Sequence, residues 1–83
     1  MVGRSAGASE LPFGAALRRV RLAAGFSQEE LGLEAAVQRN FISLIETGQN
    51  QPTLNTIAKL ARALGMKASE LVAEAERQAF LKR

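Results

Sequence analysis

The stretch from Ser27 to Gly48, "SQEELGLEAAVQRNFISLIETG", contains two short helical patterns joined by the turn "AAVQ". Ser27 and Glu30 have the spacing of a capping box, in which the serine hydroxyl and the glutamate carboxylate each accept a hydrogen bond from a backbone amide at the start of a helix. We therefore expect one helix over residues 28–35 and another over residues 38–46. The second helix is too short to be stable alone, so it must be held by packing.

Gly32 lies in the middle of the first of these two helices. A glycine there costs about 1 kcal/mol relative to alanine, so its presence needs a physical reason. The reason we expect is a neighbouring backbone that approaches too closely for a side chain, and the helix over residues 38–46 is the obvious neighbour.

Outside this stretch, apolar residues at helical spacing predict three more helices. The first ends before Gly25, the fourth begins after the capping residue Thr53, and the fifth spans residues 68–82. No segment has the alternation of a strand, so the sequence predicts an all-α fold with five helices. We expect residues 1–10 to form a flexible N-terminal tail and residues 11–83 to form a single domain.

The composition excludes several classes of function. The 83 residues include no cysteine and no histidine, which removes disulfides, thiol nucleophiles, the usual zinc sites and the commonest general base. We therefore expect no enzyme activity, no metal and no cofactor. No segment has the length of a membrane span or the pattern of a secretory signal, so we expect a cytoplasmic protein without a membrane partner. The net charge of +3 is compatible with a nucleic-acid partner but does not establish one.

The helix over residues 38–46 has two different faces. Ile42 and Ile45 have the spacing of a buried face, which turns Arg39, Asn40, Ser43 and Leu44 outward and places Gln38 at the leading end. Arginine and the amide side chains read base edges in the major groove, and the two helices with their tight turn have the proportions of a helix-turn-helix. The alternative is that these polar residues are only a solvated helix face.

Four segments of the chain together resemble the Cro/repressor-type (XRE-family) helix-turn-helix proteins: "LRRVR", "GFSQEEL", "FISLIETG" and "PTLNTIAKLARALG". The resemblance covers residues 13–65, and the C-terminal remainder is similar to that of short phage-type repressors and of restriction-modification controller proteins. It implies a five-helix, lambda-repressor-like DNA-binding domain with the helix-turn-helix at the second and third helices.

The resemblance also implies roles for individual residues. The expected base contacts are Gln38, Arg39, Asn40, Ser43 and Leu44. The expected DNA backbone contacts are Ser27, Gln28, Asn50, Gln51 and Thr53, of which the last three have the alternative of being turn formers or a cap. Arg21 and Glu46 match a pair that forms a structural ion pair between the first and third helices.

The chain departs from the family pattern at a few positions. Ala36 and Val37 occupy a turn where relatives often have glycine or asparagine, so backbone strain is expected there. Gln38 replaces the usual small capping residue. Leu33 and Leu44 stand where a polar residue is common, and single exposed leucines need no functional explanation.

The C-terminal helix, within residues 67–83, has more apolar residues than a small domain needs. We expect Leu71, Val72, Ala75, Ala79 and Phe80 to form a dimer interface, with the alternative that they cover only the domain's own core. A two-fold dimer would place two recognition helices about 34 Å apart, one turn of DNA.

Two hypotheses for the function follow. The first is a sequence-specific DNA-binding transcriptional regulator, a repressor or autoregulator that binds a palindromic operator in double-stranded DNA as a homodimer. The alternative is an antitoxin-like module that binds a toxin or another protein partner. The sequence leaves open the operator, activation or repression, the regulated genes, any effector ligand and the host.

Overall fold

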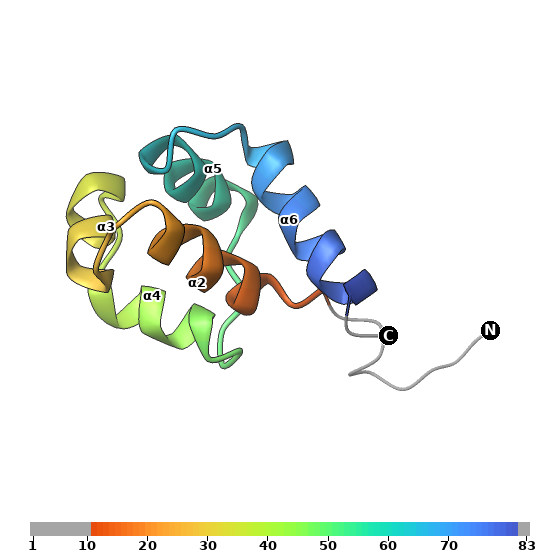
Figure 1. Ribbon diagram of the computed structural model, residues 1–83. Coiled ribbons are helices and arrows are strands. Elements are labelled where there is room, and N and C mark those ends of the chain that lie inside the picture. The colour runs from red at the N-terminus through yellow and green to blue at the C-terminus, as the bar shows by residue number, and fades with distance from the viewer. Residues whose placement is uncertain (1–10, 82–83) are drawn as a thin grey trace.

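The computed structural model describes residues 11–81, which form five helices and no strand (Figure 1). This confirms the all-α fold and the number of helices. The predicted tail over residues 1–10 and the last two residues lie outside the described range. The helices are α2 (Phe13–Ala23), α3 (Gln28–Ala35), α4 (Arg39–Glu46), α5 (Leu54–Ala63) and α6 (Ala68–Leu81).

The ends of α3 and α5 are set by the capping residues that the sequence predicted. The Glu30 amide donates to Ser27 Oγ over 3.0 Å, and the Ser27 amide donates to Glu30 Oε1 over 2.8 Å, which completes the capping box. At the start of α5, the Thr56 amide donates to Thr53 Oγ1 over 3.1 Å. After α4 the chain reverses at Gly48, whose φ of +80° is readily adopted only by glycine.

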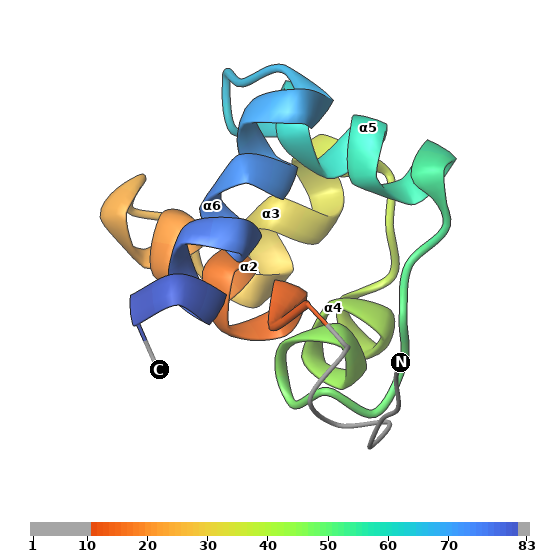
Figure 2. The same ribbon diagram turned by 90° about the vertical axis from the view of Figure 1, so that its right-hand side faces the viewer.

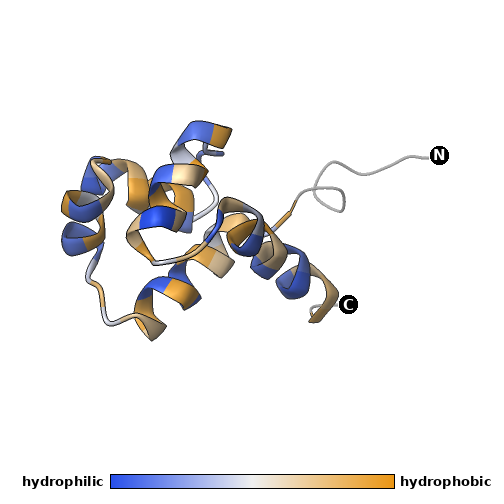
Figure 3. Cartoon of the chain, turned by 90° about the horizontal axis from the view of Figure 1, so that it is seen from above, coloured by the Kyte–Doolittle hydropathy of each residue, from blue (hydrophilic) through white to orange (hydrophobic). Residues whose placement is uncertain are grey.

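One apolar core joins all five helices. The largest fully buried side chains are Leu17 of α2, Leu31 of α3, Ile42 and Ile45 of α4, Leu60 of α5 and Leu71 of α6. Figure 3 shows hydrophilic and hydrophobic residues alternating along each helix, so each presents one face to the core and another to solvent. Burial of Ile42 and Ile45 explains how α4, with only eight residues, is held in place.

The five helices pack in a closed ring, in which each contacts two others. Helix α2 packs against α6 on one side and against α4 on another, while α3 packs against α4 and α5, and α5 packs against α6 (Figure 2). Helices α3 and α4 therefore lie at one end of the molecule, and the C-terminal half of α6 projects away from them (Figure 1).

The turn between α3 and α4 is closely packed against α3, and its backbone is strained at Ala36. A Cβ atom on Gly32 would lie 2.6 Å from the carbonyl oxygen of Val37, so the close neighbour is the turn itself, whereas we expected the following helix. Ala36 ends α3 in the left-handed conformation, with φ 58° and ψ 44°. This is the backbone strain expected where relatives have glycine or asparagine. The predicted start of α4 is corrected by one residue, since Gln38 is its N-cap.

Candidate nucleic-acid interface

The outward face of α4 carries the residues predicted to read bases. Gln38, Arg39 and Asn40 are exposed, and Ser43 and Leu44 are partly exposed. Ile42 and Ile45 anchor the opposite face in the core, so the backbone beneath these side chains is fixed while the side chains remain accessible. The structure thus brings the five residues together on one surface, and base contact by each of them stays a prediction.

The leading end of α4 differs from the other capped helix starts. Gln38 has extended backbone angles, and its side chain makes no capping hydrogen bond. Its amide group is therefore not occupied as a cap, unlike the Ser27 and Thr53 side chains. A free amide at the N-terminus of a helix can donate to a phosphate or pair with a base edge.

A buried ion pair fixes the other end of α4. Arg21 Nε and Nη2 donate to the two carboxylate oxygens of Glu46 over 2.6 and 3.0 Å, and Arg21 Nη1 donates to the Phe26 carbonyl oxygen over 2.8 Å. The side chains of Arg21 and Glu46 are only 7% and 3% exposed. The hydrogen bond and the charge of Glu46 raise the pKa of Arg21, against the effect of burial, so the guanidinium stays charged. Helices α2 and α4 are joined by this pair in the way the family resemblance implies.

Gln28 belongs to the same network. Its Nε2 donates to Glu46 Oε1 over 3.0 Å, which fixes the orientation of the amide at the start of α3. The Gln28 side chain is therefore not simply a phosphate ligand, because one of its two N–H donors is already used. The second N–H of Gln28 and the backbone amides of Gln28 and Glu29, which precede the capped Glu30 amide, are the groups that remain for the predicted phosphate contact.

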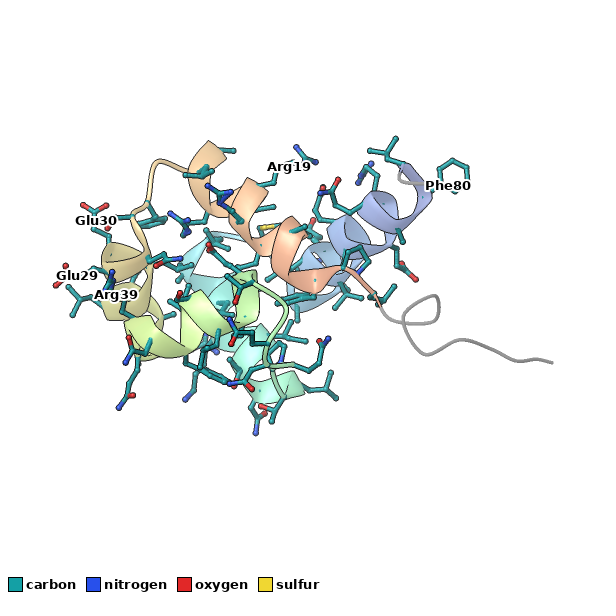
Figure 4. The ribbon with its side chains drawn as sticks, turned by 90° about the horizontal axis from the view of Figure 1, so that it is seen from below. Arg19, Glu29, Glu30, Arg39 and Phe80 are labelled. Atoms are coloured by element: carbon teal, nitrogen blue, oxygen red, sulfur yellow. The ribbon has the colours of Figure 1, made fainter. Side chains whose placement is uncertain are left out.

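The exposed side of α3 is acidic. Glu29, Glu30 and Glu34 are exposed, and Figure 4 shows Glu29 and Glu30 near Arg39 at the same end of the molecule. Hydrogen bonds from the backbone and side chain of Ser27 lower the pKa of Glu30, so its carboxylate stays ionised. An open depression about 400 Å³ in volume lies between α3 and α4 and is lined by both Glu29 and Arg39. This acidic side of α3 disfavours close approach of a polyanion, so the exposed face of α4 is the more suitable of the two for such a ligand.

The loop before α5 holds the other predicted backbone contacts. Asn50, Gln51 and Thr53 are all exposed. Thr53 acts as the cap of α5, which is the structural alternative considered for it, and its Oγ1 also lies 3.0 Å from Thr56 Oγ1. Contact of these three residues with a phosphate stays a prediction.

Helix α5 contributes two polar residues that the sequence argument missed. Thr56 and Lys59 line an open depression of about 310 Å³ together with Gln38 and Phe41 of the α4 region. Thr53, Thr56 and Lys59 follow one another at intervals of three residues, which places them on one side of a helix. That spacing is visible in the sequence, but only the packing of α5 against α3 brings this side next to the turn that leads into α4.

The dimer residues predicted on α6 need correction. Leu71 and Ala75 are completely buried within this chain, because both face the core beside α2 and α5. They have no surface to offer a second copy, so their assignment to an interface was wrong. Val72 and Ala79 are partly exposed, Phe80 is 69% exposed, and the neighbouring Leu81 is 66% exposed.

Residues 11–81 contain neither a membrane-spanning helix nor a cluster of metal ligands. No helix in this range is long and apolar enough to cross a membrane. In the same range, no group of three or more histidine, cysteine, aspartate or glutamate side chains is placed to hold a metal ion.

Comparison with known proteins gives consistent matches. A family model described as "Helix-turn-helix domain" matches residues 12–75. The control protein C.BamHI of Bacillus amyloliquefaciens is 38% identical over 63 residues, which are 75% of this chain and 78% of that protein. The crystal structure of the restriction-modification controller protein C.AhdI of Aeromonas hydrophila superposes with a TM-score of 0.70 at 39% identity, covering 74% of this chain and 92% of that one.

A second solved structure matches more of the chain. The clp gene regulator ClgR of Corynebacterium glutamicum has a TM-score of 0.80 at 28% identity, covering 87% of this chain and 77% of its own. The residues matched by the family model, 12–75, contain α2, α3, α4, α5 and the first part of α6.

Proposed function

This chain belongs to the helix-turn-helix domain family, and we propose that it is a sequence-specific transcriptional regulator that binds a palindromic operator as a homodimer. The coarser conclusion, a DNA-binding regulator, rests on the family and on relatives named as controllers and regulators. The finer conclusion rests on the geometry of α4. We also propose that it acts in the cytoplasm.

The observation that carries the proposal is the contrast between the two faces of α4. Two isoleucines and the buried Arg21–Glu46 pair hold this helix rigidly, and Arg39 and Asn40 stand exposed in its first turn. Arginine pairs in a bidentate manner with guanine, and asparagine does so with adenine. A fixed backbone with these side chains at its outer end is what direct reading of the major groove requires.

A second copy is needed because one domain has little positive charge near α4. Arg39 is the only basic residue between Ser27 and Thr53, whereas Glu29, Glu30 and Glu34 are exposed there. Two recognition helices on a palindrome combine two weak half-site contacts into one strong interaction.

The exposed apolar residues at the end of α6 support a dimer, although the interface differs from the one expected from the sequence. Figure 4 places Phe80 and Arg39 toward opposite ends of the molecule, whose longest dimension is 41 Å. Two copies joined in line at Phe80 would hold their recognition helices further apart than one DNA turn of about 34 Å. We therefore place the interface along one side of α6, from Val72, which lines an apolar depression of about 290 Å³ with Leu11, to the exposed Phe80 near the end of the helix.

We further propose that the protein represses or autoregulates by occupying a promoter operator. Binding of a small dimer across a promoter excludes other proteins from the same DNA without a catalytic step. The alternative of an antitoxin has no support in the three relatives named above, whose names describe controllers and a gene regulator.

The test is selection of binding sites from a random pool of double-stranded DNA with the purified chain at physiological salt, where non-specific contacts weaken. We expect enrichment of an inverted repeat with half-sites about one helical turn apart. The double substitution Arg39→Ala with Asn40→Ala should abolish the enrichment, because each bidentate pair discriminates by about 1 to 3 kcal/mol.

The matched control is Arg62→Ala with Asn55→Ala, which removes the same side-chain types from exposed positions of α5. Enrichment should survive in this variant. A folded wild-type protein that enriches no sequence would overturn the proposed function, and enrichment of a single unrepeated half-site would overturn only the dimeric mode.

A further inference from the structure

We propose that Lys59 binds a phosphate of the DNA backbone beside the recognition helix, from the wall of the depression that α5 forms with the start of α4. The inference deepens the proposed function and rests on it, because the ligand is the duplex that α4 reads. It names a contact on a helix to which neither the sequence nor the family comparison assigned a DNA contact beyond the cap Thr53.

The first step in the argument is the shortage of positive charge. Three glutamates are exposed on α3, and the fourth acidic residue of the helix-turn-helix, Glu46, is neutralised by Arg21. Protein–DNA affinity comes largely from lysine and arginine side chains that neutralise phosphates. A domain with this acidic helix needs a cation beside α4 in addition to Arg39.

The second step is to ask which cations are available. Two exposed arginines, Arg19 and Arg77, already pair with Glu74 at 2.8 and 3.2 Å. The shared partner Glu74 lies on α6, so both arginines are engaged on that helix. Lys59, by contrast, is exposed and shares a surface depression with Gln38, the N-cap of the recognition helix.

The third step is the chemistry of the depression. Its walls carry the Gln38 amide, the Thr56 hydroxyl and the Lys59 ammonium, all of which can donate hydrogen bonds, and no carboxylate lines it. The depression lined by Glu29 and Arg39 on the other side of Gln38 does contain a carboxylate. Of these two neighbouring depressions, the one beside α5 is therefore the one that suits a phosphate.

The final step concerns reach. An ammonium on a flexible four-carbon stem binds phosphate as a point charge and needs no fixed orientation. Lys59 can therefore follow the DNA backbone while Gln38 and Arg39 approach the groove. Such a contact strengthens binding and sets the position of the domain but carries no sequence information.

The experiment compares Lys59→Gln with Lys67→Gln in the full-length chain. Both lysines are exposed, so the two variants lose the same charge, but Lys67 lies in the connection between α5 and α6, on the side of the molecule away from α4 (Figure 1). Binding is measured over a series of salt concentrations with two 30-bp duplexes, one carrying the selected inverted repeat and one of unrelated sequence.

We expect Lys59→Gln to weaken binding to both duplexes by the same factor. The slope of log affinity against log salt should fall in magnitude by about 0.9 for each bound protomer, the value for one lost phosphate contact. Lys59→Arg should restore the wild-type slope, and Lys67→Gln should leave it unchanged.

Four outcomes would overturn the inference. Equal slopes for Lys59→Gln and Lys67→Gln would show that Lys59 contributes only net charge. A loss confined to the selected duplex would make Lys59 a base contact. Failure of the wild-type chain to bind either duplex would overturn the proposed function itself and this contact with it, whereas wild-type binding with an unaffected Lys59 variant would overturn the contact alone.

Discussion

Helices α4 and α6 each bury two side chains in the core but expose opposite kinds of surface. In α4 the buried residues are Ile42 and Ile45, and the exposed residues at its start, Gln38, Arg39 and Asn40, are polar. In α6 they are Leu71 and Ala75, and the exposed end carries Phe80 and Leu81. Two buried residues hold each helix in the core, so the exposed surface of each helix indicates what it binds. The hydrogen-bonding groups of α4 suit nucleic acid, and the exposed apolar end of α6 suits another protein chain.

The largest effect should come from breaking the anchor of α4. Glu46→Ala leaves the Arg21 guanidinium buried without its carboxylate, which should lower the free energy of unfolding by about 3 to 5 kcal/mol. Denaturant titration followed by circular dichroism measures this change. The same truncation on α6, Glu74→Ala, removes ion pairs to Arg19 and Arg77 whose arginines are more than half exposed, and should cost less than about 1 kcal/mol.

Equal losses for the two glutamate variants would contradict this view of α4. They would mean that burial of the Arg21–Glu46 pair adds nothing beyond an exposed pair, and that the isoleucines alone hold the recognition helix.

The next effect separates the two surfaces of α6. Leu71→Ala should leave a cavity and lower the free energy of unfolding by about 2 to 4 kcal/mol, without changing the dimer directly. Phe80→Ala should affect the stability of the monomer less, because most of that side chain is exposed, and should weaken self-association. Denaturation at concentrations where the chain is monomeric, together with sedimentation equilibrium, distinguishes the two effects.

The opposite result would be an unchanged association constant for Phe80→Ala and a lower one for Leu71→Ala, measured where both variants are fully folded. In that case the surface of α6 that we assign to the dimer is the wrong one. The apolar end of α6 would then belong to another kind of contact.

The same comparison explains what the sequence predicted well and what it did not. Helical periodicity identified the five helices and the two faces of α4, because Ile42 and Ile45 face the core whichever helix covers them. On α6 periodicity identified an apolar side but not what covers it, so Leu71 and Ala75 were assigned to a second copy although α2 and α5 already enclose them.

The contact between elements distant in sequence was the other part that could not be predicted. Lys59 is separated from Gln38 by more than a whole helix and a loop, and no local pattern shows that the two residues line one depression. The Gln28 hydrogen bond to Glu46 likewise depends on where α3 and α4 meet. Arg21 and Glu46 were paired in advance only because the family resemblance supplied the pairing.

The smallest effect concerns the turn between α3 and α4, which sets the orientation of α4. Ala36 is in the left-handed conformation, which costs a residue with a Cβ atom about 1 to 2 kcal/mol. Glycine avoids this cost, but it loses more conformational entropy on folding, which offsets part of the gain. Ala36→Gly should therefore raise the free energy of unfolding by up to about 1 kcal/mol, while Ala35→Gly, one residue earlier in the buried helical turn, should lower it. The Val37 carbonyl packs directly against Gly32, and this contact should preserve the shape of the turn in the variant. Ala36→Gly should therefore keep its affinity for the selected duplex. A stabilised variant with weaker binding would instead show that the strained alanine restricts α4 to the orientation that reads DNA.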